Sequence, residues 1–501
     1  MSSVPNSVDE RPPRRRDPED GGSFRLAALW SYSLIWGRLA ITTILAFVLA
    51  ALLGPEAYGV IAMALVFTGF VEMLQQQGMM PAIIAHRALD DDHKDTAFWL
   101  VIGVGVVLSA SAILAAPWWA SVNHLPELTP VIRVLALGVP LTSSVVVHEA
   151  VLRRTMQFKR LAAATWTAVI AGGLVGLSGA LLGWGVWALV AQQLAMVVTT
   201  VCVLWWISSW RPRLNFRLQA ARDLWHYSVR SSTSSLAMFF GGRMDVILGG
   251  ALFGPVAIGV YRMAQRLTEV VLDVTFRGMQ SVSLPGLAQV QDARVVRNTR
   301  FLTMQRRAVC LALPLLGIVA ATAPVVQDLL GDEWTGTATA IRLLVIVQAL
   351  RAMTGLMGPA LQAVNRPGTL AILQVVLAGA GATAIVVASR VSESTDAVAT
   401  LSMAVISATV VTSILVAHVT GRILEIRWRD ILRSWAPGLL AGLAATTASY
   451  ASFHALASTA PLVATFVAGT VGLVSGGVVV LAADPALRQV VVGRLRPHTS
   501  G

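Results

Sequence analysis

The chain has 501 residues, of which 55% are hydrophobic and only 13% are charged, and its formal net charge is +12. With a mean hydropathy of +0.69, this composition leaves too little polar surface for a soluble protein of this size. The sequence therefore predicts an all-α polytopic membrane protein.

Fourteen stretches of the chain are apolar and long enough to cross a bilayer, for which a helix needs about 20 residues. Residues 1–23, ahead of the first stretch, are polar and Pro-rich and cannot bury apolar surface. We expect a disordered cytoplasmic tail there, without a cleaved signal peptide. The predicted helices begin near Leu26, Ala57, Thr96, Leu128, Leu161, Val186, Trp225, Val256, Ala308, Thr337, Gly368, Ala397, Ala436 and Pro461.

Lysine and arginine alternate along the chain as the positive-inside rule requires. With the N-terminus inside, 29 of the 38 basic residues fall in inner loops and tails, eight fall inside helices, and only Arg390 falls in an outer loop. A wrong helix count would scramble this pattern. Both termini are therefore predicted to be cytoplasmic, and the positive charge indicates topology rather than a nucleic-acid partner.

One phrase occurs twice: ALLGPEAYGV at Ala51–Val60 and ALFGPVAIGV at Ala251–Val260 agree at seven of ten positions. The first copy follows helix 1 and the second follows helix 7, so both Gly-Pro pairs fall on the outer side. An even separation indicates parallel repeats, related by an axis along the membrane normal. The sequence thus predicts two six-helix lobes.

The lobes define the predicted domain boundaries. An N-terminal lobe of helices 1–6 spans residues 24–210, and a basic cytoplasmic linker spans residues 211–221. Helices 7–11 of the C-terminal lobe occupy residues 222–390, and helix 12 completes it in residues 391–425. Two extra helices follow in residues 426–485, with a cytoplasmic tail in residues 486–501.

Arginines inside the predicted helices are the candidates for function, because an ionisable residue in a membrane helix costs several kcal/mol and faces the interior or a cavity. Arg133, Arg230 and Arg342 lie close enough to helix ends to reach the interface. The other five are Arg38, Arg243, Arg262, Arg266 and Arg351. Counted from Gly254-Pro255, Arg243 and Arg266 both lie roughly 16 Å deep. Two guanidiniums at one level could hold a diphosphate.

Helix 8 carries a charged stripe. Arg262, Arg266, Glu269 and Asp273 follow one another at intervals of four, three and four, which places them on one face. That face cannot point at lipid. Either Arg266 pairs with Glu269 and Arg262 with Asp245 as structural ion pairs, or the stripe lines a cavity, and the two interpretations are compatible.

The sequence gives little support for an enzymatic function. The only lysines, Lys94 and Lys159, stand outside any Walker A phosphate loop, which excludes ATP hydrolysis by this chain. The outer segments hold no paired catalytic constellation. Cys202 and Cys310 sit in separate predicted helices without metal-ligand spacing. We expect no catalytic residues, no metal and no cofactor.

Several segments resemble a known family. They are LLGPEAYGVIAM, RMDVILGGALFGPVAIGVYRMAQRL, SLPGLAQVQ, GDEW and LQAVNRPG, together with GMMPAII followed by acidic residues and AFWL. Their order and spacing are similar to the Wzx-like and TuaB-like polysaccharide-export flippases of the multidrug/oligosaccharidyl-lipid/polysaccharide exporter superfamily. The resemblance runs from about residue 30 to about residue 480. One departure is the polar stretch Glu72–Gln77, where family members often have a Gly-rich helix.

The resemblance implies two six-helix lobes around a central cavity that opens alternately to each side. It implies a substrate glycan on a polyprenyl diphosphate, moved from the inner to the outer leaflet of a bacterial plasma membrane for cell-surface polysaccharide or lipopolysaccharide biosynthesis. The implied partners are this lipid-linked glycan, membrane lipids and other polysaccharide assembly proteins. Our candidate cavity residues are Arg38, Arg243, Arg262, Arg266, Glu269, Asp273 and Asp245.

Three alternatives stay open. An ion-coupled drug exporter of the same superfamily would be expected to place acids in the first lobe, whereas helix 1 carries Arg38 and no acid. A peptidoglycan-precursor flippase satisfies the charge pattern equally well. A structural membrane protein would keep its arginines at interfaces or in closed pairs, which the helix 8 stripe disfavours.

Overall fold

The structure is a computed structural model that describes residues 19–85, 89–391, 396–456 and 460–483. Within these ranges the chain forms fifteen α-helices and one short 3-10 helix, and no strand. The predicted all-α class is confirmed. Ten of the described helices are long and apolar enough to cross a membrane, or eleven if one bent pair counts as a single span.

Two very long elements, α1 (Glu19–Ala85) and α8 (Leu218–Ala288), each consist of two arms joined at a glycine. The φ of Gly54 is 73° and that of Gly254 is 82°, a region that glycine adopts without steric cost. Each element folds back at this point. Tyr58 donates a hydrogen bond to the Ala46 carbonyl, although twelve residues of straight helix would separate them by about 18 Å. The arms correspond to predicted helices 1, 2, 7 and 8.

The rest of the N-lobe, which we define as α1 to α7, packs around the arms of α1. The fourth predicted span is broken into three short helices, with a bend of 44° before α5. At this bend Thr142, Ser143 and Ser144 donate to carbonyls of their own helix, a pattern that bends helices. The elements are α2 (Asp91–Val122), α3 (Leu128–Ala136), α4 (Gly138–Ser143), α5 (Val146–Arg154), α6 (Phe158–Leu181) and α7 (Val186–Ile207).

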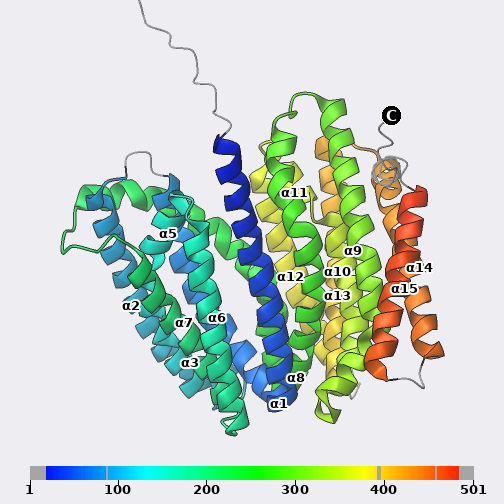
Figure 1. The fold of residues 1–501 in the computed structure, drawn as a ribbon, viewed down its shortest axis with the longest axis horizontal. Coiled ribbons are helices and arrows are strands. Elements are labelled where there is room, and N and C mark those ends of the chain that lie inside the picture. Colours follow the sequence, from blue (N-terminus) through cyan, green and yellow to red (C-terminus); the bar gives the residue numbers. More distant parts are fainter. Residues whose placement is uncertain (1–18, 86–88, 392–395, 457–459, 484–501) are drawn as a thin grey trace, which may run out of the picture.

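The C-lobe, α8 to α13, packs around the arms of α8 in the same way. Its elements after α8 are α9 (Arg294–Leu330), η1 (Asp332–Trp334), α10 (Thr337–Thr354), α11 (Met357–Ala363), α12 (Pro367–Val391) and α13 (Ala397–Leu424). In Figure 1 the two lobes lie on either side of α1 and α8, and the chain enters α1 and leaves α15 on the same face of the bundle.

The last two helices, α14 (Trp428–Ala455) and α15 (Pro461–Ala483), pack on the outside of α9. Small residues let the backbones approach. A Cβ at Gly442 would lie 3.0 Å from that of Leu313, and one at Gly476 would lie 2.9 Å from that of Pro314. Close helix contacts through small residues are typical of membrane bundles. The described helices match the fourteen predicted membrane crossings when each arm of α1 and of α8 is counted as one crossing, the bent group α3 to α5 is counted as one, and α14 is included.

Two predicted boundaries need correction. The helix α1 begins at Glu19, inside the segment assigned to the tail. Residues 1–18 lie outside the described part. The linker ends at Arg217 rather than at residue 221, because α8 begins at Leu218.

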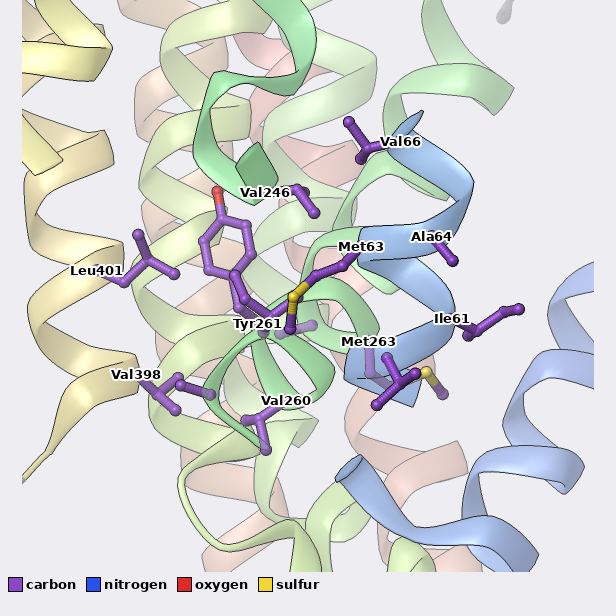
Figure 2. Close-up of a cluster of buried hydrophobic side chains, with 14 of the residues drawn as sticks. Ile61, Met63, Ala64, Val66, Val246, Val260, Tyr261, Met263, Val398 and Leu401 are labelled. Atoms are coloured by element: carbon purple, nitrogen blue, oxygen red, sulfur yellow. The ribbon is translucent and has the colours of Figure 1, made fainter. Parts of the chain in front are cut away.

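The main hydrophobic core lies where the arms of α1 and α8 cross. Figure 2 shows Met63 of α1 beside Tyr261 of α8, with Leu401 of α13 facing them. These side chains are at most 2% exposed. The core therefore joins the two lobes at their centre and fixes the region from which the functional site is built.

Candidate functional site

The repeated Gly-Pro phrases meet each other. A Cβ added to Gly59 would lie 1.8 Å from the Pro255 carbonyl oxygen, and one added to Gly259 would lie 1.8 Å from the Pro55 carbonyl oxygen. The two contacts are reciprocal, because Gly59 meets Pro255 as Gly259 meets Pro55, as expected of a two-fold relation. We call these four residues the tip contact. Only glycine allows the two backbones to approach so closely.

A loop from the C-lobe reinforces the tip contact. Trp334 of η1 is 1% exposed, donates its indole N–H to the Ala50 carbonyl at 3.2 Å, and meets Tyr58 edge to face at 5.8 Å. In the N-lobe, Asn123 at the end of α2 lies against Gly250, the repeat equivalent of Ala50. Each lobe therefore holds the hairpin of the other beside the tip contact.

A cavity of about 570 Å³ lies between the lobes, on one side of the tip contact. From α8 it receives three cationic side chains, Arg243, Arg262 and Arg266. The α1 arms contribute Leu39, Thr42 and Tyr58 among others, and α7 contributes a glutamine pair, Gln192 and Gln193. Since Asp273 also lines it, this central cavity carries a formal charge of +2 on its described side chains.

The structure places most of the predicted site residues around this cavity. Arg243, Arg262, Arg266 and Asp273 line it directly. Glu269 instead lines an adjoining cavity, where a carboxylate oxygen lies 3.9 Å from Arg351 Nη1. The side chains of Arg38, Arg230 and the Glu72–Gln77 stretch, apart from Met73, lie outside the described set. Arg133 and Arg342, predicted as interface anchors, are exposed.

Asp245 has different partners from those predicted. Its carboxylate accepts hydrogen bonds from Tyr261 Oη at 2.8 Å and from Gln265 Nε2 at 3.3 Å. Arg262 donates to Gln265 Oε1 at 2.7 Å. The Arg262–Asp245 ion pair, which was one of the two interpretations of the charged stripe, is therefore replaced by a relay through Gln265, whose amide can donate and accept at once. This arrangement leaves the charge of Arg262 available to the central cavity.

Sequence reasoning missed Gln192 and Gln193 as lining residues. Two adjacent amides inside the apolar stretch Val186–Ile207 were a usable signal, because uncharged polar groups in a membrane helix also seek an interior or a cavity. Their amides can both donate to phosphate oxygens and accept from hydroxyl groups.

A family model described as "Polysaccharide biosynthesis protein" matches residues 48–339, more than half of the chain. The chain belongs to this family. The matched region contains both Gly-Pro phrases, the arginines of α8 and Trp334. The predicted family is thus confirmed, and with it the prediction of a transporter rather than an enzyme, because one relative is named a transport protein and another a probable flippase.

Two relatives illustrate the family. The succinoglycan biosynthesis transport protein ExoT of Rhizobium meliloti (strain 1021) is 24% identical over 68% of this chain and 69% of its own length. The teichuronic acid biosynthesis protein TuaB of Bacillus subtilis (strain 168) is 23% identical over 60% of this chain and 62% of its own length. The matched region therefore spans about two thirds of the length of each of these relatives.

Solved structures support the fold. The lipid II flippase MurJ in an inward closed conformation superposes with a TM-score of 0.69 at 10% identity, covering 93% of this chain and 99% of that one. An inward-facing multidrug resistance transporter of the MATE family gives 0.63 at 17% identity, covering 77% and 94%. At these identities the likeness concerns the fold alone.

Proposed function

We propose that this polysaccharide biosynthesis protein is a flippase, which moves an oligosaccharide linked to a polyprenyl diphosphate from the inner to the outer leaflet by alternating access. The observation that carries the proposal is the set of three arginines from α8 around the central cavity. A diphosphate crossing hydrocarbon needs fixed positive charge, and guanidinium groups bind phosphate oxygens in bidentate geometry. The lipid tail stays in the bilayer while the headgroup enters the cavity.

In this proposal, one end of the molecule faces the outside of the membrane and the other faces the cytoplasm. The tip contact closes the outer end of the cavity, because the basic loops predicted to be cytoplasmic lie at the other end of the helices. The described conformation then corresponds to a carrier closed toward the outside. Transport requires the tip contact to separate while the inner ends approach each other. We place the chain in a bacterial plasma membrane with both termini cytoplasmic, alongside other polysaccharide assembly proteins.

The test is to delete the gene and measure polyprenyl-diphosphate-linked glycans by mass spectrometry, with a membrane-impermeant glycosidase reporting their side. We expect one such lipid to accumulate on the cytoplasmic face. Complementation with Arg243→Ala or Arg266→Ala at normal protein levels should fail. Arg342→Ala is the matched control, because this exposed arginine donates to the Ala320 carbonyl and lines no described cavity.

Other outcomes would change the assignment. Accumulation of a peptidoglycan precursor would reassign the cargo within the same mechanism. Unchanged lipid-linked glycans, together with altered sensitivity to small toxic molecules, would favour a drug exporter. Full complementation by both arginine variants would remove the proposed diphosphate site.

A further inference from the structure

A second cavity, of about 590 Å³, lies inside the C-lobe between α8, α10, α12 and α13. We call it the C-lobe chamber. It adjoins the central cavity, because Asp273 lines both. Most of its polar lining is uncharged and comes from Gln280, Gln348, Gln374, Thr409, Thr412 and Ser413. A space of this size lies within the usual range for small-molecule sites.

The hydroxyl groups of the chamber are set to accept hydrogen bonds. Thr409 Oγ1 donates its proton to the Val405 carbonyl at 2.7 Å, and Thr412 Oγ1 donates to the Ala408 carbonyl at 2.8 Å. Since each hydroxyl has one proton and two lone pairs, the oxygens can still accept from a ligand. Such a wall suits a ligand that is rich in hydroxyl donors.

Gln348 gives an independent sign of a ligand. It lies in the wall of the chamber and is only 1% exposed, yet neither its Nε2 nor its Oε1 has a hydrogen-bond partner among the described residues. An unsatisfied amide within a membrane protein is costly, because no bulk water can replace the missing partners. A bound group that both donates and accepts would remove this cost.

The two cavities differ in their charge. The central cavity holds three arginines against Asp273. In the chamber, Arg351 lies 3.9 Å from Glu269, and Asp273, which lines both cavities, is a second acid, so the lining has no excess of positive charge. The chamber therefore lacks the positive charge with which the central cavity attracts an anionic group. A cargo with a diphosphate joined to a neutral polar group matches this division.

We propose that the C-lobe chamber binds the uncharged sugar nearest the diphosphate, with Gln348 as a hydrogen-bonding contact. This inference rests on the proposed function, since it places the diphosphate in the central cavity. It adds the prediction that the protein distinguishes a glycosylated carrier from the bare lipid diphosphate, and that it does so through the C-lobe rather than through the arginines.

The experiment uses the full-length protein in lipid nanodiscs and measures dissociation constants by native mass spectrometry. The probes are undecaprenyl diphosphate and its glucosyl, galactosyl, N-acetylglucosaminyl and glucuronosyl derivatives. In the wild type, at least one neutral sugar should tighten binding about tenfold, as two or three additional hydrogen bonds would. Glucuronic acid should give no increase. Gln348→Leu should lose most of the neutral-sugar increase and bind undecaprenyl diphosphate as the wild type does.

Gln305→Leu is the matched control. Gln305 is also 1% exposed and its Oε1 lacks a partner among the described residues, but its Nε2 donates to the Ala352 carbonyl at 2.9 Å and it lines neither cavity. This variant should lose thermal stability and keep the sugar preference, the opposite of Gln348→Leu. If wild-type protein binds undecaprenyl diphosphate but no neutral sugar strengthens binding, or if Gln348→Leu keeps the full increase, the chamber proposal is overturned alone. Failure to bind undecaprenyl diphosphate at all overturns the proposed function with it.

Discussion

Adding one methyl group to the tip contact should open the outer end of the molecule. In Gly59→Ala the new Cβ would lie 1.8 Å from the Pro255 carbonyl oxygen. The shortest ordinary carbon–oxygen contacts are about 3.3 Å, so the two hairpins must separate by roughly 1.5 Å. Overpacking of this kind costs about 1–3 kcal/mol. Because the cost falls only on the state in which the tips touch, the outward-open state should gain about 5- to 150-fold in relative population.

The assay is the rate at which an external, membrane-impermeant maleimide labels Ala62→Cys in intact cells, with Cys202 and Cys310 replaced by alanine. Ala62 lines the central cavity, so a reagent from outside must pass the tip contact to reach it. Gly59→Ala and Gly259→Ala should each speed labelling, since the contact is reciprocal. Gly103→Ala is the control, because a Cβ at this helix position would meet nothing within 4 Å. Equal labelling rates in Gly59→Ala, Gly103→Ala and the parent would refute the reasoning.

Three further predictions concern other contacts. Trp334→Phe keeps a buried ring but removes the bond to the Ala50 carbonyl, so it should speed the same labelling about fivefold; an unchanged rate would mean that this bond does not hold the outer end shut. Asp92→Ala removes the acceptor for Asn215 Nδ2 (2.6 Å) and Arg217 Nη1 (2.7 Å), so trypsin should cut the linker several-fold faster. Asp91→Ala is the control and should not have this effect, because Asp91 pairs with Lys94 on α2 instead. Gly442→Val should lower the thermal midpoint of the detergent-solubilised protein through a loss of about 1–3 kcal/mol at the α9–α14 contact; Gly477→Val, where a Cβ would meet nothing within 4 Å, is its control, and equal midpoints would contradict the packing argument.

Local patterns were enough to predict much of the fold. Most of the apolar stretches are long enough to identify a membrane helix by themselves, and α7, α10, α13 and α15 begin at the predicted residues. The Gly-Pro repeat correctly marked the two hairpin turns. It could not show that Gly59 packs on Pro255 and Gly259 on Pro55, because a repeat gives the relation between two segments and not the distance between them.

The charged face of α8 could also be predicted, since helical spacing alone brings Arg262 and Arg266 to one side. The partners of these charged side chains could not be predicted. Arg351 lies 82 positions from Glu269, and only the packing of α10 against α8 brings them together. Gln265 was overlooked between Arg262 and Asp245, although one amide can accept from the first group and donate to the second.

The central claim is that this protein carries a lipid-linked glycan across the bilayer, and reconstitution tests it most directly. Purified protein would be placed in liposomes containing a fluorescent polyprenyl-diphosphate-linked oligosaccharide from the host, and an added impermeant glycosidase would report the fraction on the outer leaflet. Liposomes with wild-type protein should lose nearly all of the glycan to the enzyme, whereas protein-free liposomes and those with Arg243→Ala/Arg266→Ala should lose only the outer half. A wild-type protein that leaves the inner half protected would contradict the claim.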